Sequence, residues 1–274
     1  MAEKETKNRL KSLVEAVPEE LAKIEINIAE HAEQPIIEKR LTREEKRAFF
    51  EAEANKKAVD SWVPKTVLGR LVKEGKIKNI DEIISNHKKI LESEIVDSLL
   101  RLEKDLLLIG QAKGKFGGGK RRAWRQTQRK TMEGNVVTFS CMAVVGDKSS
   151  HVGVGYGKSK ETLPSREKAI RKAKLSIIKI TRGFETQEEK SALPHTVPFA
   201  VEGKCGSIRI KLIPAPRGTG LVIGDEGKKI LRLAGIEDIY AVTNGHTRTT
   251  FNVAKAIIDA LEKTNKVMQK RLLQ

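Results

Sequence analysis

The chain has 274 residues, of which 53 are Lys or Arg and 36 are Asp or Glu, so its formal net charge is +17. A surplus of this size favours a polyanionic partner, with nucleic acid ahead of a membrane surface. No apolar run approaches the roughly 18 residues of a spanning helix, and the first residues lack the layout of a signal peptide. The two cysteines have no Cys-x-x-Cys spacing, which favours a reduced, cytoplasmic compartment. Aromatic residues make up only 4% of the chain, so we expect charge and shape to outweigh base stacking.

Residues 1–60 contain no glycine and are rich in Glu, Lys and Ala. Leu10, Leu13, Val14 and Val17 recur at helical spacing, which predicts a helical N-terminal extension over 1–60. A second segment, 61–124, begins at Trp62, whose size favours a role as a hydrophobic anchor over that of a stacking platform. Three short helices are predicted in this segment, near 66–73, 80–85 and 93–108.

The segment 113–130 combines an uncompensated positive charge with glycines and two aromatic residues, Phe116 and Trp124. A run of charge is commonly a solvated face, but this composition favours an arm that grips RNA and becomes ordered only on contact. The segment contains eight cations and no acid: Lys113, Lys115, Lys120, Arg121, Arg122, Arg125, Arg129 and Lys130.

Part of the same segment resembles a nucleotide-binding loop. Gly114-x4-Gly119-Lys120 matches most of a Walker A motif, in which glycine amides cradle phosphates. Arg121 stands where the motif requires a Ser or Thr to bind Mg²⁺. Nucleotide hydrolysis is therefore disfavoured.

Alternating apolar residues predict a strand over 136–145, a turn over 146–150 and a return strand over 151–157. The return strand would direct Val152, Val154 and Tyr156 inward and three glycines to its other face. Glycines at period two indicate that another backbone or an RNA strand passes close by. An amphipathic helix follows from Pro164 to about residue 181, and a polar linker covers 182–193.

The last part of the chain alternates strands and helices. A hairpin with a turn over 202–206 leads into a strand, in which Ile208, Ile210 and Leu212 alternate with cations until Pro214 ends it. Arg217 lies at the tip of the turn that follows. A helix over 224–234, a strand over 236–242 and a helix over 250–263 complete an α+β sandwich.

No catalytic site is indicated. The five histidines lie far apart, and neither they nor the cysteines have the spacing of metal ligands. No serine stands in a nucleophile elbow. We therefore expect neither an enzyme nor a bound metal or cofactor.

Residues 203–220, GKCGSIRIKLIPAPRGTG, closely resemble the signature of the ribosomal protein S5 family of the small subunit, in its archaeal and eukaryotic form. The resemblance extends in consistent order over about 61–265 and includes residues 144–157, VVGDKSSHVGVGYG. It implies an α+β protein in which a domain similar to double-stranded-RNA-binding domains, 125–190, precedes an α+β domain with a left-handed βαβ crossover, 191–274. Segment 61–124 resembles the archaeal pre-domain.

The resemblance also implies a function. Family members bind ribosomal RNA near the body-head junction, contact neighbouring small-subunit proteins, help to line the messenger-RNA entry channel and influence decoding accuracy. By this similarity the turn 147–151 and the glycine strand face RNA, and Arg217 belongs to the signature loop. These expectations add Lys148, His151, Gly153, Gly155, Lys158, Lys160 and Arg217 to the cations of 113–130 as candidate RNA-binding residues.

Two short segments depart from the family pattern. Adjacent arginines often precede the long strand, where this chain has Gly134, Asn135 and Val136, so the basic segment 113–130 is expected to replace their contacts. A cysteine-rich segment is replaced by residues 183–189, so no zinc is expected. An alternative is a free RNA-processing enzyme or RNA chaperone that reuses the same domains.

Overall fold

The computed structural model describes residues 61–86, 88–111, 121–185 and 193–272, with side chains up to residue 266. The predicted extension over 1–60 lies outside the described residues. So do Lys113, Lys115 and Lys120, and with them the Walker-like loop.

The first described segment consists of three short helices, α4 (Val67–Lys73), α5 (Ile80–Ser85) and α6 (Ser93–Leu99). Glu92, which precedes α6, holds the start of this segment, because its carboxylate accepts hydrogen bonds from the Trp62 indole at 2.7 Å and from the Thr66 amide at 2.6 Å. Trp62 packs on the apolar cluster of these helices, so the prediction of an anchor is confirmed. We refer to residues 62–102 as the helical segment.

The helix predicted over 93–108 is wrong beyond Leu99. Residues 103–106 form a strand, β1 (Glu103–Leu106), which pairs antiparallel with the end of the long strand β3 (Gly134–Gly146). Leucine favours helix locally, but the open edge of β3 offers backbone hydrogen bonds that the local pattern does not reveal.

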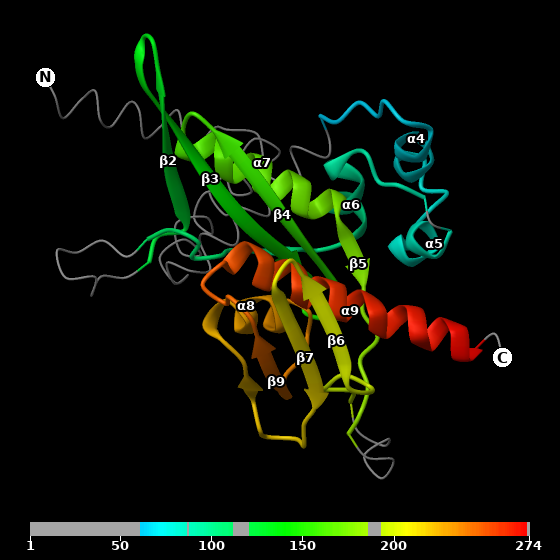
Figure 1. Ribbon diagram of the computed structural model, residues 1–274. Coiled ribbons are helices and arrows are strands. Elements are labelled where there is room, and N and C mark those ends of the chain that lie inside the picture. The colour runs from blue at the N-terminus through cyan, green and yellow to red at the C-terminus, as the bar shows by residue number, and fades with distance from the viewer. Residues whose placement is uncertain (1–60, 87, 112–120, 186–192, 273–274) are drawn as a thin grey trace, which may run out of the picture. The chain divides into compact units, whose positions relative to one another are not determined.

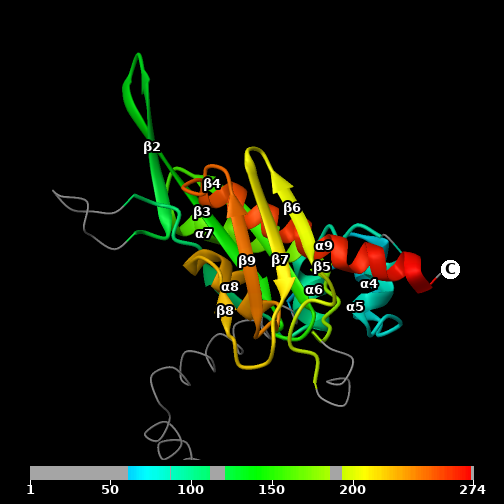
Figure 2. The same ribbon diagram turned by 60° about the horizontal axis from the view of Figure 1, so that its bottom comes forward.

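The first sheet has the order β1-β3-β4-β5, with β2 (Trp124–Thr131) paired to the other half of β3. Strand β4 (His151–Ser159) returns along β3, and β5 (Ile177–Lys179) pairs with β4 after helix α7 (Thr162–Leu175). The pairing of β3 with β4 ends at Phe139, so residues 134–138 pair with β2 alone and form a hairpin that extends past β4 (Figures 1 and 2). Residues 124–130 of the basic segment, which was predicted to be an arm, thus form part of strand β2.

The close neighbour predicted for the glycine strand is helix α7. A Cβ at Gly155 would lie 2.2 Å from the carbonyl oxygen of Ala169, and one at Gly153 would lie 2.2 Å from that of Ala173. The three glycines of β4 thus let α7 lie directly on the sheet.

The second sheet has the order β6-β7-β9-β8 and belongs to the C-terminal part of the chain. Strands β6 (Val201–Cys205) and β7 (Ile208–Pro214) form a hairpin, as predicted, but its turn lies at 206–207. The turn predicted over 202–206 is wrong, because residues 202–205 belong to β6. Strand β9 (Ile239–Asn244) pairs with β7, and the short strand β8 (Leu221–Val222), which the sequence did not indicate, pairs parallel with β9. Helices α8 (Asp225–Leu233) and α9 (Thr250–Leu272) cover one face, and α9 continues past the predicted end at 263.

The two sheets share one apolar core. Met142 and Val144 of the first sheet are buried in the same cluster as Ile210, Ile230 and Ile257 of the C-terminal part. The β3–β4 face opposite α7 is therefore covered along part of its length and open beyond it, which decides where a partner can lie.

Candidate nucleic-acid interface

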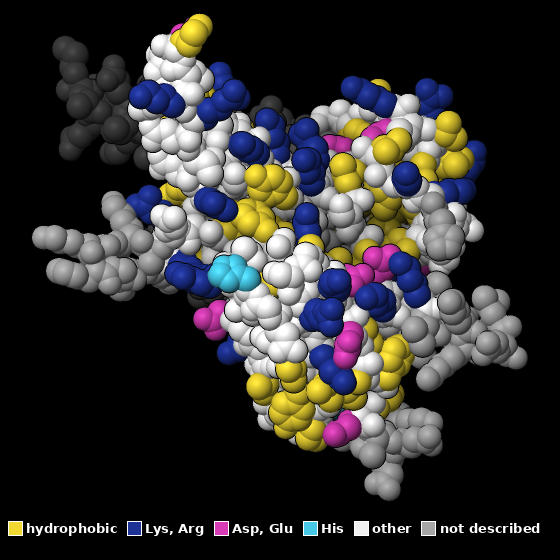
Figure 3. Space-filling model, in the orientation of Figure 1, with side chains coloured by type: hydrophobic (Ala, Val, Ile, Leu, Met, Phe, Trp, Pro, Cys, Tyr) yellow, Lys and Arg dark blue, Asp and Glu magenta, His cyan; other side chains and the backbone are white. Residues whose placement is uncertain are grey.

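Strands β2, β3 and β4 contain no Asp or Glu. The pairing places Arg125, Ser140 and Lys158 directly opposite one another, and opposite residues lie on the same face of a sheet. Arg129, four residues along β2, lies on that face as well. We call Arg125, Arg129 and Lys158, all exposed, the cationic face. Figure 3 shows Lys and Arg side chains gathered over these strands, with few acids among them.

The cationic face is the one opposite α7. Gly157, next to Lys158, would clash with Ser165 of α7 if it carried a Cβ, so the residues on either side of it point away from that helix. The face is therefore open where the C-terminal part no longer covers it, and it can attract phosphate groups.

On the other side of the sheet, Trp124 lies between two arginines. The guanidinium carbons of Arg122 and Arg166 lie 5.6 Å and 5.3 Å from the centre of a Trp124 ring. Trp124 also packs on Ala169 of α7 and on Cys141, so it holds the root of the hairpin and is not a free stacking platform. Arg166 was not among the sequence candidates, since its contact with Trp124 arises only in the fold.

The turn between β3 and β4 is built on Asp147. One carboxylate oxygen of Asp147 accepts hydrogen bonds from the amides of Ser149, Ser150 and His151 at 2.8–2.9 Å. The other oxygen lies 2.8 Å from Nδ1 of His151. Lys148 takes a positive φ of 58°, is exposed and forms an ion pair with Glu103. Its charge is thus shared with this chain's own acid.

His151 is buried between two carboxylates. Its Nε2 lies 2.9 Å from Asp81 of α5, whose other oxygen accepts a hydrogen bond from Lys179 at 2.6 Å. Burial works against the charged form, but the hydrogen bonds and charges of Asp147 and Asp81 outweigh it and raise the pKa of His151. Burial would also raise the pKa of Asp147, but its hydrogen bonds hold that pKa well below the ordinary range.

Three predicted RNA contacts are therefore corrected. His151 is only 6% exposed and is engaged by Asp81 and Asp147. Gly153 and Gly155 are buried beneath α7, so their open face serves helix packing and not RNA. Lys160, by contrast, is exposed just after β4.

Arg217 lies in the signature loop between β7 and β8. Pro214 ends β7, and Gly218 and Gly220 take positive φ values of 88° and 74°. The exposed guanidinium donates to the carbonyl of Leu193 at 3.1 Å, so this arginine holds the preceding linker to its own loop.

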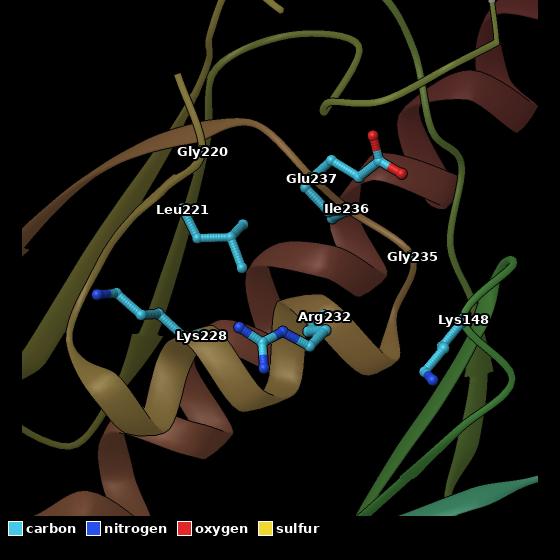
Figure 4. Close-up of a pocket in the computed structure, with 8 residues that line it drawn as sticks. All are labelled: Lys148, Gly220, Leu221, Lys228, Arg232, Gly235, Ile236 and Glu237. Carbon is cyan, nitrogen blue, oxygen red and sulfur yellow. The ribbon is translucent and has the colours of Figure 1, made fainter. Parts of the chain in front are cut away.

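A groove of about 520 Å³ lies between the β3–β4 turn and the C-terminal part (Figure 4). Lys148, Lys228 and Arg232 line it together with a single acid, Glu237. Figure 4 shows Arg232 and Lys228 on the same side of helix α8. This groove could accept an anionic group but contains no arrangement suited to acid–base or nucleophilic catalysis. No group of three His, Cys, Asp or Glu in the described ranges could hold a metal ion.

No helix within the described residues is long and apolar enough to cross a membrane.

Tyr156 is more exposed than the sequence predicted. The alternation with Val152 and Val154 predicted an inward side chain, and Tyr156 does lie on that face, where its ring meets Phe251 of α9, but it remains 36% exposed.

Two family models match the chain, the N-terminal domain of ribosomal protein S5 over 122–181 and its C-terminal domain over 203–272. The small ribosomal subunit protein uS5 of Nanoarchaeum equitans is 50% identical over 210 residues, covering 76% of this chain and 90% of that protein. The uS5 of Thermofilum pendens is 46% identical and covers 74% of this chain and 94% of its own length. The uS5 of Methanocaldococcus jannaschii is 44% identical, over 76% and 89% respectively.

Proposed function

Since the chain belongs to the ribosomal protein S5 family, we propose that ribosomal RNA lies on the cationic face of β2–β4 and fixes the protein in its particle. The protein is a structural constituent of the small ribosomal subunit, of the archaeal type. The resemblance noted in the sequence is therefore confirmed for the family.

One observation carries the proposal: Arg125, Arg129 and Lys158 share an exposed face of strands that contain no acid. Phosphate contacts by Arg and Lys supply most of the affinity of proteins for nucleic acid, and they need cations that are not already neutralised. Within the described part of the chain, no carboxylate pairs with any of the three.

The remaining candidates extend this surface along the chain. Arg121, Lys130 and Lys160 are exposed near the same strands. Lys113, Lys115 and Lys120 precede β2 directly and are proposed to continue the contact. Lys148 and Arg217 are weaker candidates, because Glu103 and the Leu193 carbonyl already engage them.

Membership in the family supports finer proposals. The protein would lie near the body-head junction, contact neighbouring small-subunit proteins, help to form the messenger-RNA entry channel and support decoding accuracy. It would work with ribosomes in the cytoplasm, without cofactor or catalytic activity. The parallel pair β8–β9, joined by α8, is the βαβ unit whose crossover we propose to be left-handed.

A free RNA-processing enzyme or RNA chaperone is the alternative from another class. An enzyme would be supported by a groove lined with catalytic groups. The charged residues that line the groove in Figure 4 are three cations and one acid. Substoichiometric presence on ribosomes would favour this alternative.

RNA binding measured against salt tests the proposal. Replacing Arg125 and Arg129 by Gln removes two phosphate contacts, so the slope of log K against log salt should become shallower by between about 1 and 2. The binding of full-length protein to small-subunit ribosomal RNA, titrated at several salt concentrations, measures this slope.

Lys204 and Arg209 provide a matched control pair. They lie directly opposite each other on exposed positions of β6 and β7, far along the chain from the cationic face. Their replacement by Gln should leave the slope unchanged. An unchanged slope for the Arg125 and Arg129 variant would refute the assignment of the face.

A further inference from the structure

Tyr156 lies on β4 between the cationic face and the part of the β3–β4 face that the C-terminal part covers. Its partner across β3 is Met142, which is buried in the shared core. Lys158 follows two positions later on the same face, about 7 Å along the strand. Arg125 lies two strands away from Lys158, at about 10 Å. An exposed aromatic ring thus shares one face of the sheet with Lys158, two positions along the same strand, and with Arg125, two strands away.

The ring of Tyr156 is held in place by two contacts. Its hydroxyl donates to the Ser140 hydroxyl oxygen at 3.1 Å, and its ring meets that of Phe251 edge to face, with centroids 5.2 Å apart at 78°. Both contacts reduce the rotamer freedom that a free tyrosine would lose on binding. Nevertheless, Tyr156 remains 36% exposed.

We propose that Tyr156 stacks on an unpaired base of RNA while Lys158 and Arg125 contact the adjoining phosphates. The inference rests on the proposed RNA contact of this face and adds its ligand: single-stranded nucleotides and not a continuous duplex. Bases inside a duplex are already stacked on their neighbours, so an aromatic side chain reaches only splayed or unpaired ones.

One stacking position is compatible with the low aromatic content of the chain. Charge supplies the affinity for the strand, and the single ring selects an unpaired base at one point along it. The chain offers its own control, because its only other tyrosine, Tyr240, is 41% exposed on β9 of the second sheet.

The test uses full-length protein and a short single-stranded RNA that carries 2-aminopurine, a base whose fluorescence falls when it stacks. The wild-type protein should quench the probe. Tyr156→Leu should abolish the quenching and weaken single-strand binding between about fivefold and a hundredfold, with an unchanged salt slope. Tyr156→Phe keeps the ring and should retain most of both signals, and Tyr240→Leu should change neither.

The outcomes separate this inference from the proposed function. If wild-type protein binds the strand without quenching, or if Tyr156→Leu binds as tightly as wild type, the stacking site is refuted while the cationic face stands. If Tyr156→Phe loses as much affinity as Tyr156→Leu, the hydroxyl and not the ring is responsible, which also overturns stacking. If the wild-type protein binds no RNA, the proposed function itself fails. An equal loss of affinity for perfect duplex RNA in Tyr156→Leu would contradict the preference for unpaired bases.

Discussion

Among single residues, Asp147 and His151 show how much of the local charge serves the fold. Asp147 closes the β3–β4 turn through three backbone amides, and His151 joins that turn to Asp81 of α5. Lys174 of α7 likewise donates to Asp97 of the helical segment at 2.5 Å, and Lys179 donates to Asp81. Acids of the helical segment thus neutralise two lysines and engage one of the predicted RNA-binding residues, His151. Arg125, Arg129 and Lys158 of β2 and β4, by contrast, have no such acid partner within the described residues.

The contribution of His151 to stability should depend on pH. The groups that face its ring are Asp147, Asp81 and the Ser150 hydroxyl, and Lys179 binds the far oxygen of Asp81. Because the folded pKa of His151 is raised above its ordinary 6.5, its stabilisation is complete below that pH and is lost as pH rises through the folded pKa. His151→Gln should therefore lower the free energy of unfolding by about 1–3 kcal/mol near pH 6. Urea unfolding of both proteins at several pH values measures the difference.

The exposed His246 is the matched control for this experiment. His246→Gln should cost less than about 0.5 kcal/mol at any pH, because the side chain is exposed. A difference in the free energy of unfolding between wild type and His151→Gln that stays constant from pH 5 to 9 would contradict a stabilisation that depends on the protonation of His151. So would a histidine resonance of residue 151 that titrates at or below its ordinary pKa.

At the scale of elements, the packing of α7 on β4 depends on glycine. Glycines at every second position of β4 predicted a strand with one face free of side chains. The neighbour on that face could have been a protein backbone or RNA. Sequence could not decide between them, because the neighbour is determined by how α7 folds back, which is a tertiary contact. The same reason explains β1, whose residues favour helix locally and become a strand only by pairing with β3.

Gly155→Ala should therefore destabilise the protein strongly. Its Cβ would lie 2.2 Å from both the Ala169 carbonyl oxygen and the Ala173 amide nitrogen, backbone atoms that cannot turn aside. We expect a loss of roughly 1–3 kcal/mol or more in the free energy of unfolding, as for overpacked cores. Thermal or urea unfolding of the full chain gives the value.

Gly224→Ala tests whether the loss at Gly155 comes from packing. No atom lies within 4 Å of a Cβ built at Gly224, and its φ is −60°, so this change should cost at most about 1 kcal/mol, from the helix cap of α8. Equal losses at both positions would show that the close approach of α7 is not the cause.

For the described molecule as a whole, charge and core lie in different places. The shared core joins Met142 and Val144 of the first sheet to α8, α9 and β7, while the cationic face lies beyond it on β2 and β4. The sequence predicted the order of most elements after residue 120, and its signature identified the family. The sequence could not predict which cations lack a partner within the chain. Lys174, Lys179 and Arg217 donate hydrogen bonds to residues that are distant in the sequence and come close only in the fold.

The central claim is that the protein is a stoichiometric part of the small ribosomal subunit, held there by the cationic face. Sedimentation of tagged full-length protein from its own cells tests this most directly. We predict about one copy per small subunit after a moderate-salt wash, with release of the Arg125 and Arg129 variant at lower salt than that of the Lys204 and Arg209 variant. Wild-type protein that sediments free of the subunit, or at substoichiometric amounts, would contradict the account.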